Sequence, residues 1–483
     1  MNYRICLKYL GIIYTLIGIS MLLPIGFGLY YKETESWSLI ISMVIAIVIG
    51  LSMAVPFYRV KEDVLRKEGF FIVTLAWVGA GVIGSMPFLI SGSLGSPVDA
   101  FFEAISGFTT TGSTIIADLT PLSKCILLWR NQTQWLGGMG IIVLMVALFS
   151  FFGAGGKSVF YSEAPGVYRT GITPRIQDSA RKLWLIYVAI SLAETIMLMF
   201  GGLSFYEALL HTFSTMATGG FSNHNESIAF YRSAYIDWTI IVFMALAGTN
   251  FGLYYVVLTM GGKLKTFIQD YEWKVYVGIL LTSTILITIF LSFNNVYSFS
   301  EGLRHSAFQV VSMATTTGYC TQDFDRWPQF ARLLLVVLMF VGGCTGSTGG
   351  GMKVFRVIVV IKHAFQEIFR MFHPSAISTL RVGRQVVINE TKSNILGFFV
   401  LSMMLFAGFS LFVAAYDIDL ITSTTSVAAT LWNIGPGLSR VGAVQNFAWM
   451  PAGVKAGLSL AMIIGRLELF TVLVLFTPKF WKS

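Results

Sequence analysis

Charged residues are scarce in this chain of 483 residues: only 12% are Asp, Glu, Lys or Arg, while 55% are hydrophobic. A soluble domain carries roughly a quarter of its residues as charged ones, so the composition excludes an ordinary soluble protein. The apolar residues occur in runs of about 20 rather than in alternation, which predicts membrane-spanning helices.

Cysteine is rare as well, and the usual motifs of catalytic and metal centres are missing. The four cysteines are scattered without a CxxC pair, and the five histidines show no HExxH spacing. No GxSxG sequence is present to supply a serine nucleophile. The pattern favours neither a disulfide framework nor a zinc site. We expect a protein that is not an enzyme and that binds no cofactor.

Positive charge is in excess, with 33 Lys and Arg against 24 Asp and Glu. When the loops between apolar runs are assigned to alternate sides, 23 basic residues fall on the side that carries Arg4 and Lys482. Nine fall on the other side, and Arg466 lies within a span. Cytoplasmic loops of membrane proteins carry such an excess. The charge therefore predicts that both termini are cytoplasmic, and it does not indicate nucleic-acid binding.

The first apolar run follows Arg4 and Lys8, as the core of a signal peptide does. It is long enough to span a membrane and no small-residue cleavage site follows it, so we expect a retained helix. Ten spans are predicted, at Tyr9–Tyr31, Ser36–Tyr58, Gly69–Ser91, Leu127–Phe152, Leu183–Gly201, Ile236–Gly261, Val275–Phe293, Ala331–Ile361, Ile395–Tyr416 and Val454–Thr477.

Four shorter, semi-polar segments lie between these spans, and each has the length of a re-entrant half-helix. They are predicted at Val98–Gly107, Phe205–Thr215, Glu301–Ala314 and Thr422–Leu431. Each is followed by a glycine-bearing break: Thr-Thr-Thr-Gly at 109–112, Met-Ala-Thr-Gly at 216–219, Thr-Thr-Thr-Gly at 315–318 and Trp-Asn-Ile-Gly at 432–435. The glycines are 107, 99 and 117 residues apart, which indicates one unit repeated four times.

The repeat predicts an all-α integral membrane fold. Four units of helix, pore loop and helix surround a central pore, and two further transmembrane helices precede them. The predicted boundaries are residues 1–68 for the two N-terminal helices, 69–156 for pore unit 1, 157–262 for unit 2, 263–361 for unit 3 with its broken last helix, and 362–483 for unit 4.

The four breaks are suited to coordinating a cation. Irregular backbone survives at membrane depth only where protein buries it or water lines it, and converging carbonyls replace the hydration shell of an ion. No carboxylate lies in any break, which favours a monovalent ion over calcium or magnesium. The alternative is that Gly and Thr only permit close helix packing. The predicted backbone ligands are Thr110, Thr111, Gly112, Ala217, Thr218, Gly219, Thr316, Thr317, Gly318, Asn433, Ile434 and Gly435.

In their order, the breaks TTTGS, MATGG, TTTGY and NIGPG resemble the membrane subunits of Trk/Ktr/HKT potassium transporters. Two extra N-terminal helices make the chain most similar to the bacterial Trk membrane subunit. In that family each break is one quarter of a selectivity filter, and a glycine in every quarter accompanies potassium preference. The resemblance implies that these glycines are Gly112, Gly219, Gly318 and Gly435. The fourth break departs from the pattern, with Asn433 and Ile434 in place of threonines.

The eighth predicted span is interrupted by the sequence GGCTGSTGGGMK, residues 342–353. Each glycine costs about 1 kcal/mol in a helix, so we expect a flexible, water-lined loop below the filter. A kink for close helix packing is the alternative. A phosphate-binding loop is not indicated, because no Ser or Thr follows Lys353. The resemblance implies an intramembrane gating loop, with glycines Gly342, Gly343, Gly346, Gly349, Gly350 and Gly351.

Arg466 lies in the last span, where an arginine is costly and is a functional candidate by default. We expect it either to repel ions in the closed state or to hold the loop through its carbonyls, and the resemblance implies a part in gating. The alternative is a guanidinium that extends to the membrane surface or pairs with Glu468.

The predicted function is potassium uptake through a channel-like pore, with potassium as the transported substrate. The alternatives are an alternating-access carrier and a sodium-permeable one. The resemblance further implies a location in the bacterial inner membrane, a homodimer with one pore per protomer, and control by a separate cytoplasmic, nucleotide-binding regulatory subunit. The basic segments 153–182 and 362–392 are candidates for binding that regulator or anionic membrane lipids.

Overall fold

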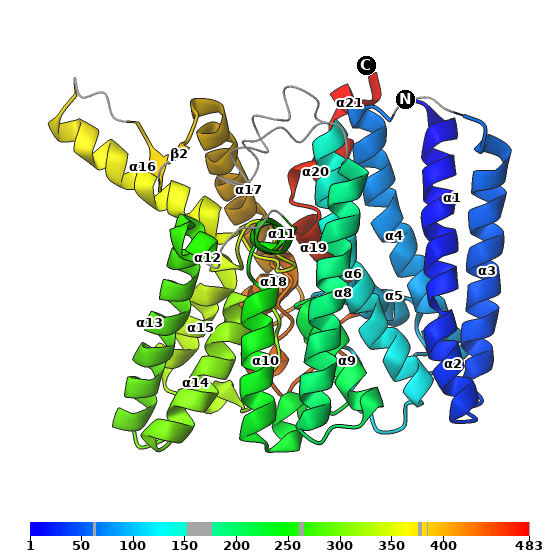
Figure 1. Cartoon of the computed structure of the whole chain (residues 1–483), viewed down its shortest axis with the longest axis horizontal. Coiled ribbons are helices and arrows are strands. Elements are labelled where there is room, and N and C mark those ends of the chain that lie inside the picture. The colour runs from blue at the N-terminus through cyan, green and yellow to red at the C-terminus, as the bar shows by residue number, and fades with distance from the viewer. Residues whose placement is uncertain (61–63, 152–175, 260–264, 375–378, 384, 483) are drawn as a thin grey trace.

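The computed structural model describes residues 1–60, 64–151, 176–259, 265–374, 379–383 and 385–482. Most of the long helices run side by side, and the two termini lie at the same end of the bundle (Figure 1). In the described part, six helices are individually long and apolar enough to cross a membrane, and two bent helix pairs raise that number to eight. The all-α membrane architecture expected from the composition is therefore confirmed.

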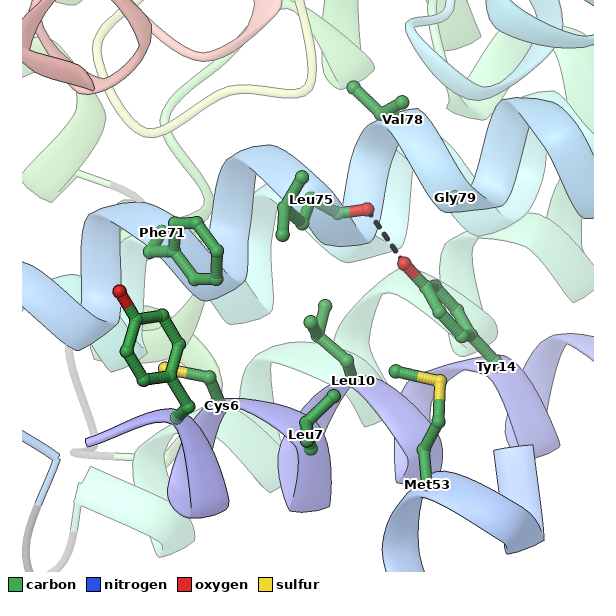
Figure 2. A pocket seen from close by; sticks show the side chains of 10 residues that line it. Cys6, Leu7, Leu10, Tyr14, Met53, Phe71, Leu75, Val78 and Gly79 are labelled. Atoms are coloured by element: carbon green, nitrogen blue, oxygen red, sulfur yellow. Dashed lines mark hydrogen bonds between the residues drawn. The ribbon is translucent and has the colours of Figure 1, made fainter. Parts of the chain in front are cut away.

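The two N-terminal spans pack closely because small residues face each other. They comprise α1 (Tyr3–Ser20) with α2 (Leu22–Tyr30), and α3 (Ser36–Ala54) with the 3-10 turn η1 (Val55–Phe57). A Cβ on Gly50 would overlap the carbonyl oxygen of Gly11, so glycine lets α1 and α3 touch. The Tyr14 hydroxyl donates to the carbonyl of Leu75 at 2.8 Å, beside an apolar hollow (Figure 2). Leu75 belongs to α4 (Arg66–Ile90), the helix that follows these two spans.

The four repeated units follow in order. The first contains α4 (Arg66–Ile90), half-helix α5 (Pro97–Phe108) and α6 (Lys124–Phe151). The second contains α8 (Ile176–Phe200), α9 (Phe205–Met216), η2 (Ser227–Tyr231), α10 (Ala234–Ala247) and α11 (Phe251–Thr259). The predicted boundaries 156/157 and 262/263 lie outside the described residues.

The third unit contains α12 (Lys265–Gln269), α13 (Tyr271–Phe293), α14 (Phe299–Ala314), η3 (Phe324–Arg326), α15 (Gln329–Val341) and α16 (Val354–Phe372). A two-stranded antiparallel hairpin follows, β1 (Arg381–Val382) with β2 (Gln385–Val386). The fourth unit contains α17 (Asn389–Ala414), α18 (Leu420–Leu431), η4 (Ser439–Val441), α19 (Ala452–Arg466), α20 (Phe470–Leu473), η5 (Val474–Phe476) and α21 (Pro478–Lys482).

Two spans that were predicted to be continuous are bent. The chain turns by 88° between α10 and α11, and by 111° between α19 and the short helices that follow. At the first bend the Asn250 side chain accepts the N–H of Gly252 at 2.7 Å and caps the new helix. At the second, Glu468 and Leu469 have positive φ angles of 58° and 45°, which no regular helix contains. The expectation of two unbroken spans was wrong.

The four half-helices have their C-termini directed at the breaks, and three of them have an N-terminus capped by a side chain. Ser204 caps α9 in a capping box with Glu207, Ser298 caps α14, and Asp419 caps α18. Three half-helices end directly before their glycine break, and α9 ends at Met216, the first residue of the second break. The partially negative C-terminal ends of these helices are therefore brought to the irregular backbone segments.

Candidate functional site

All four breaks share one backbone conformation. A first residue has φ between 53° and 62°, and a glycine two positions later has φ between 75° and 106°. The residue between them donates its N–H to the carbonyl five positions earlier. The equivalent triplets are Thr110-Thr111-Gly112, Thr218-Gly219-Gly220, Thr316-Thr317-Gly318 and Asn433-Ile434-Gly435.

In the second break this register differs by one residue from the sequence prediction. Gly219, predicted to match Gly112, occupies the position of Thr111, and Gly220 has the left-handed backbone of Gly112. A sequence signal for this register exists. A serine stands six positions before the matching glycine in the first three units, at Ser106, Ser214 and Ser312.

The four glycines close a ring. At each of them an added Cβ would meet the backbone carbonyl oxygen of the next unit, so no larger residue fits without moving that backbone. The contacts around the ring are Gly112 with Gly219, Gly220 with Thr317, Gly318 with Ile434, and Gly435 with Thr111. The fourth unit thus contacts the first, and the ring joins all four units.

A cavity opens beside the ring and is lined by Gly112, Gly220, Gly318 and Gly435 together. In the described part of the chain, no carboxylate contributes to its lining. His224 lines it as well, and burial lowers the pKa of this imidazole against a smaller opposing effect of Glu207. The imidazole is therefore uncharged at neutral pH, and the Arg130 guanidinium, which pairs with Glu103, is the one charged group in the described lining.

The glycine-rich loop between α15 and α16 lies against the opposite end of the breaks. The Gly350 N–H donates to the Thr316 hydroxyl at 2.6 Å, and the Gly351 N–H donates to the Trp432 carbonyl at 3.1 Å. The Thr348 hydroxyl lies 3.0 Å from the Met216 carbonyl. The loop was expected to be flexible and water-lined, whereas it is mostly buried and bonded to three of the four units.

Arg466 is the last residue of α19 and is 3% exposed. Its guanidinium donates to the Thr348 carbonyl at 2.8 Å and to the Gly137 carbonyl at 3.2 Å. Glu468 pairs with Arg356 at 2.6 Å, so the alternative of an Arg466–Glu468 pair is not formed. Arg466 in α19 therefore contacts the glycine-rich loop through the Thr348 carbonyl.

A family model described as TrkH, cation transport protein, matches residues 36–483. The chain belongs to this family. It is 39% identical to the Trk system potassium uptake protein TrkH of Salmonella typhimurium and 38% identical to that of Escherichia coli K12, over all of each chain. The crystal structure of the potassium transporter TrkH from Vibrio parahaemolyticus superposes with a TM-score of 0.92 at 35% identity, with full coverage of both chains.

In this TrkH-family chain, buried side chains support the ring from behind, and sequence reasoning missed them. Gln134 donates to the Gly219 carbonyl at 2.6 Å and accepts the Phe221 N–H at 3.1 Å. The Asn131 amide donates to the Phe221 carbonyl at 2.9 Å. Their positions in the run RNQTQ of α6, a polar stretch inside an apolar span, are the signal that points to them.

A buried ion pair joins the first two units outside the ring. Arg130 contacts Glu103 at 2.6 Å and donates to the Ser222 carbonyl at 2.9 Å. Glu103 also accepts the Thr114 hydroxyl at 2.9 Å and the Ile115 N–H at 3.0 Å. The pair thereby fixes the segments that follow the first and second breaks.

Glu272 on α13 is a further residue that sequence reasoning missed. One of its oxygens accepts the Thr345 N–H at 2.6 Å and the Phe355 N–H at 3.1 Å. These donors lie at the two ends of the glycine-rich loop, and Phe355 is in the first turn of α16, where a helix favours an anion. Lys353 also bonds the loop through the Gly349 carbonyl. Glu272 therefore links the two ends of the loop through hydrogen bonds to their backbone N–H groups.

Proposed function

We propose that the chain takes up potassium through a single channel-like pore that passes through the ring of four glycines. The observation that carries this proposal is the closed ring itself, in which equivalent backbone segments from four units meet with their carbonyls adjacent. Carbonyl rings replace the hydration shell of a weakly hydrated cation. The named relatives are potassium uptake proteins, which supports potassium as the transported ion.

The proposed ligands are the backbone carbonyls predicted from the sequence, with Gly220 added as the glycine of the second unit. Glycine is required at each ring position for two reasons that the geometry supplies. Its φ is positive, between 75° and 106°, and the neighbouring carbonyl leaves no room for a Cβ. No fixed negative charge lies in the breaks, so the dipoles of carbonyls and of the half-helices supply the field.

The proposed gate is the glycine-rich loop together with Arg466. The loop bonds to residues of three breaks, and Arg466 holds it at Thr348. A loop in this place obstructs the path on one side of the ring, and its release opens that path. Bonds between backbone groups and a few side chains hold the closed arrangement, so a modest conformational free energy separates the two states.

The partner proposed for control is a cytoplasmic, nucleotide-binding regulatory subunit, in line with relatives named as parts of a Trk system. A homodimer in the bacterial inner membrane and cytoplasmic termini belong to the same proposal, as does the division into four pore units. The termini and α16 lie at one end of the molecule (Figure 1), which makes that end the proposed cytoplasmic face. Most of the candidate docking segment 153–182 lies outside the described residues.

Electrophysiology of the purified protein in planar bilayers tests this function. Reversal potentials in mixed potassium and sodium are expected to favour potassium, and single-channel currents are expected once the gate is released. Equal permeability of the two ions would defeat the filter assignment and support a sodium-permeable carrier. Flux without resolvable unitary currents, at turnover rates far below those of a channel, would support alternating access.

A further inference from the structure

Glu194 is a buried acid in the membrane that neither the ring nor the loop uses. It lies in α8, six residues before the C-terminal end of this helix, and is 0% exposed. Neither carboxyl oxygen has a hydrogen-bond partner among the described residues. An ionised carboxylate in such surroundings is very costly unless a cation or a proton compensates it.

No described lysine or arginine compensates the Glu194 carboxyl. Arg466, which lies beyond Tyr187, is bonded to the Thr348 and Gly137 carbonyls. Lys182 is on the same helix but 12 residues away, about 18 Å along the axis. The titratable groups on the packed elements are Arg181, Lys182 and Tyr187 on α8, Tyr206, Glu207 and His211 on α9, Lys124 and Arg130 on α6, Tyr235 and Asp237 on α10, Tyr254 and Tyr255 on α11, and Tyr319 after the third break. Arg130 is paired with Glu103, and Asp237 with Arg304.

A hydroxyl beside the carboxyl already donates its proton to another group. Thr215, in the last turn of α9, adjoins Glu194 and donates its hydroxyl proton to the His211 carbonyl at 2.8 Å. A hydroxyl has one proton, so towards Glu194 the Thr215 oxygen can only accept. The C-terminal end of α9 also carries partial negative charge, which disfavours a second negative charge beside it. The accepting Thr215 oxygen and the negative end of α9 both favour a Glu194 carboxyl that carries a proton and donates it.

We propose that Glu194 is an intramembrane proton-binding site, a neutral carboxylic acid that donates its proton to the Thr215 hydroxyl oxygen behind the second break. The bound ligand is a single proton taken from water, and no other bond forms or breaks. The site keeps a full negative charge away from the backbone of Ala217 to Gly220, so that carbonyl dipoles set the field there. Loss of the proton would place that charge directly behind one of the four units.

Polar groups connect this region to the side of the molecule that carries the glycine cavity. The Tyr231 hydroxyl lies 2.8 Å from Nε2 of His211, and Nδ1 of His211 lies 3.2 Å from the Tyr319 hydroxyl. Tyr319 interacts electrostatically with Glu194. Each group holds an exchangeable proton or a lone pair, so Tyr231, His211 and Tyr319 form a chain of polar contacts that leads towards Glu194.

Infrared difference spectroscopy of the full-length protein in lipid nanodiscs tests the site. At neutral pH the wild-type protein is expected to show a protonated-carboxyl C=O band that Glu194→Gln removes. Glu468→Gln is the matched control, because Glu468 is ion-paired with Arg356 and its loss should reduce only carboxylate bands. Removal of carboxylate bands by Glu194→Gln, with the acid band unchanged, would overturn the proposal.

A second pair of variants tests the partner and guards against misfolding. Thr215→Val keeps the shape of the side chain but removes the acceptor, so the acid band is expected to move to higher frequency. An unmoved band would overturn the assignment of Thr215. If Glu194→Gln does not yield folded protein, Glu194→Asp should shift the same band rather than delete it. These spectra do not depend on which ion the protein conducts.

Discussion

The guanidinium of Arg466 donates a 2.8 Å hydrogen bond to the carbonyl of Thr348, a residue 118 positions earlier in the chain. The hydroxyl of the same Thr348 bonds the Met216 carbonyl at 3.0 Å, at the start of the second break. One loop residue therefore connects the arginine to the ring. A displacement of α19 or of the loop is transmitted to the second unit through two hydrogen bonds.

Replacement of Arg466 should release the loop. Arg466→Ala removes a charged hydrogen bond worth about 2 kcal/mol, enough to shift a closed-to-open equilibrium roughly 30-fold. Rubidium uptake by proteoliposomes without the regulatory subunit is expected to rise. Arg440→Ala, at an exposed arginine stacked on Trp449, serves as the control. Unchanged uptake in Arg466→Ala would show that the arginine does not restrain the path.

The corrected register predicts different effects for two adjacent glycines. Gly220→Ala places a methyl group against the Thr317 carbonyl, whereas Gly219→Ala places it against the Gln134 side chain rather than against backbone. Gly220→Ala should reduce potassium-over-sodium preference by at least about tenfold, equivalent to about 1.4 kcal/mol. Gly219→Ala should change it much less. Reversal potentials give the permeability ratio of each variant. Equal losses of potassium preference in Gly219→Ala and Gly220→Ala would contradict the observed register.

Gly318→Ser offers the matching test in the third unit. Its Cβ would overlap the Ile434 carbonyl, and the backbone φ of 81° is strained for serine. Potassium preference should fall as in Gly220→Ala. Retained preference would mean that the third break does not contribute to selection among cations.

Glu272 should govern how tightly the loop is closed. Glu272→Ala leaves the Thr345 and Phe355 N–H groups without their acceptor, at about 1–3 kcal/mol for each buried donor. Rubidium leak should rise and the melting temperature should fall, both more than in Glu272→Gln, which keeps one acceptor oxygen. Glu390→Gln, at an exposed position in the first turn of α17, is the control. A lower melting temperature with no added leak would restrict Glu272 to a role in stability.

The pair of Glu103 and Arg130 should show strong coupling in a double-mutant cycle. Removing one partner leaves an uncompensated buried charge, which costs about 3–5 kcal/mol. The losses of thermal stability in Glu103→Gln and in Arg130→Met, measured singly, should therefore add up to more than the loss in the double mutant. Additive losses, measured by thermal unfolding in detergent, would contradict the pairing.

Acidification should reduce cation entry because His224 gains a positive charge at low pH. Burial lowers the pKa of this ring below its ordinary value of 6.5, so it is neutral at pH 7 and gains charge only at lower pH. A positive charge about 10 Å from an ion in water costs about 0.4 kcal/mol, a roughly twofold effect on flux. Cation uptake should decrease as the pH drops through the pKa of His224, and His224→Gln should abolish this decrease. Because the folded state binds this proton more weakly than the unfolded state, acid also lowers stability.

The sequence allowed the repeated architecture to be predicted because each part has a local cause. Apolar length defines a span, and a polar stretch with a glycine ends each half-helix. The half-helix α9 begins at Phe205, as predicted, and α18 ends at Leu431, as predicted. These features depend on residues that are close in sequence, where composition and spacing are informative.

Features that depend on distant partners were not predictable. Gly219 and Gly220 are chemically identical, and apart from the spacing to Ser214 only the carbonyls of other units decide which one needs a positive φ. The bends after Ala247 and Arg466 coincide with the polar residues Thr249–Asn250 and Glu468, a local signal that the prediction of continuous spans did not use. Glu272 stands in an ordinary first-turn position, and its importance comes from donors more than 70 residues away.

Closure of the ring between Gly435 and Thr111 has a consequence for biosynthesis. The first unit leaves the ribosome more than 300 residues before the fourth. Asp99 and Lys455, whose side chains are 2.8 Å apart, are separated by a similar length of chain. A growing chain therefore cannot close the ring until its final unit has inserted. A product that terminates before this unit lacks Gly435 and leaves the ring open.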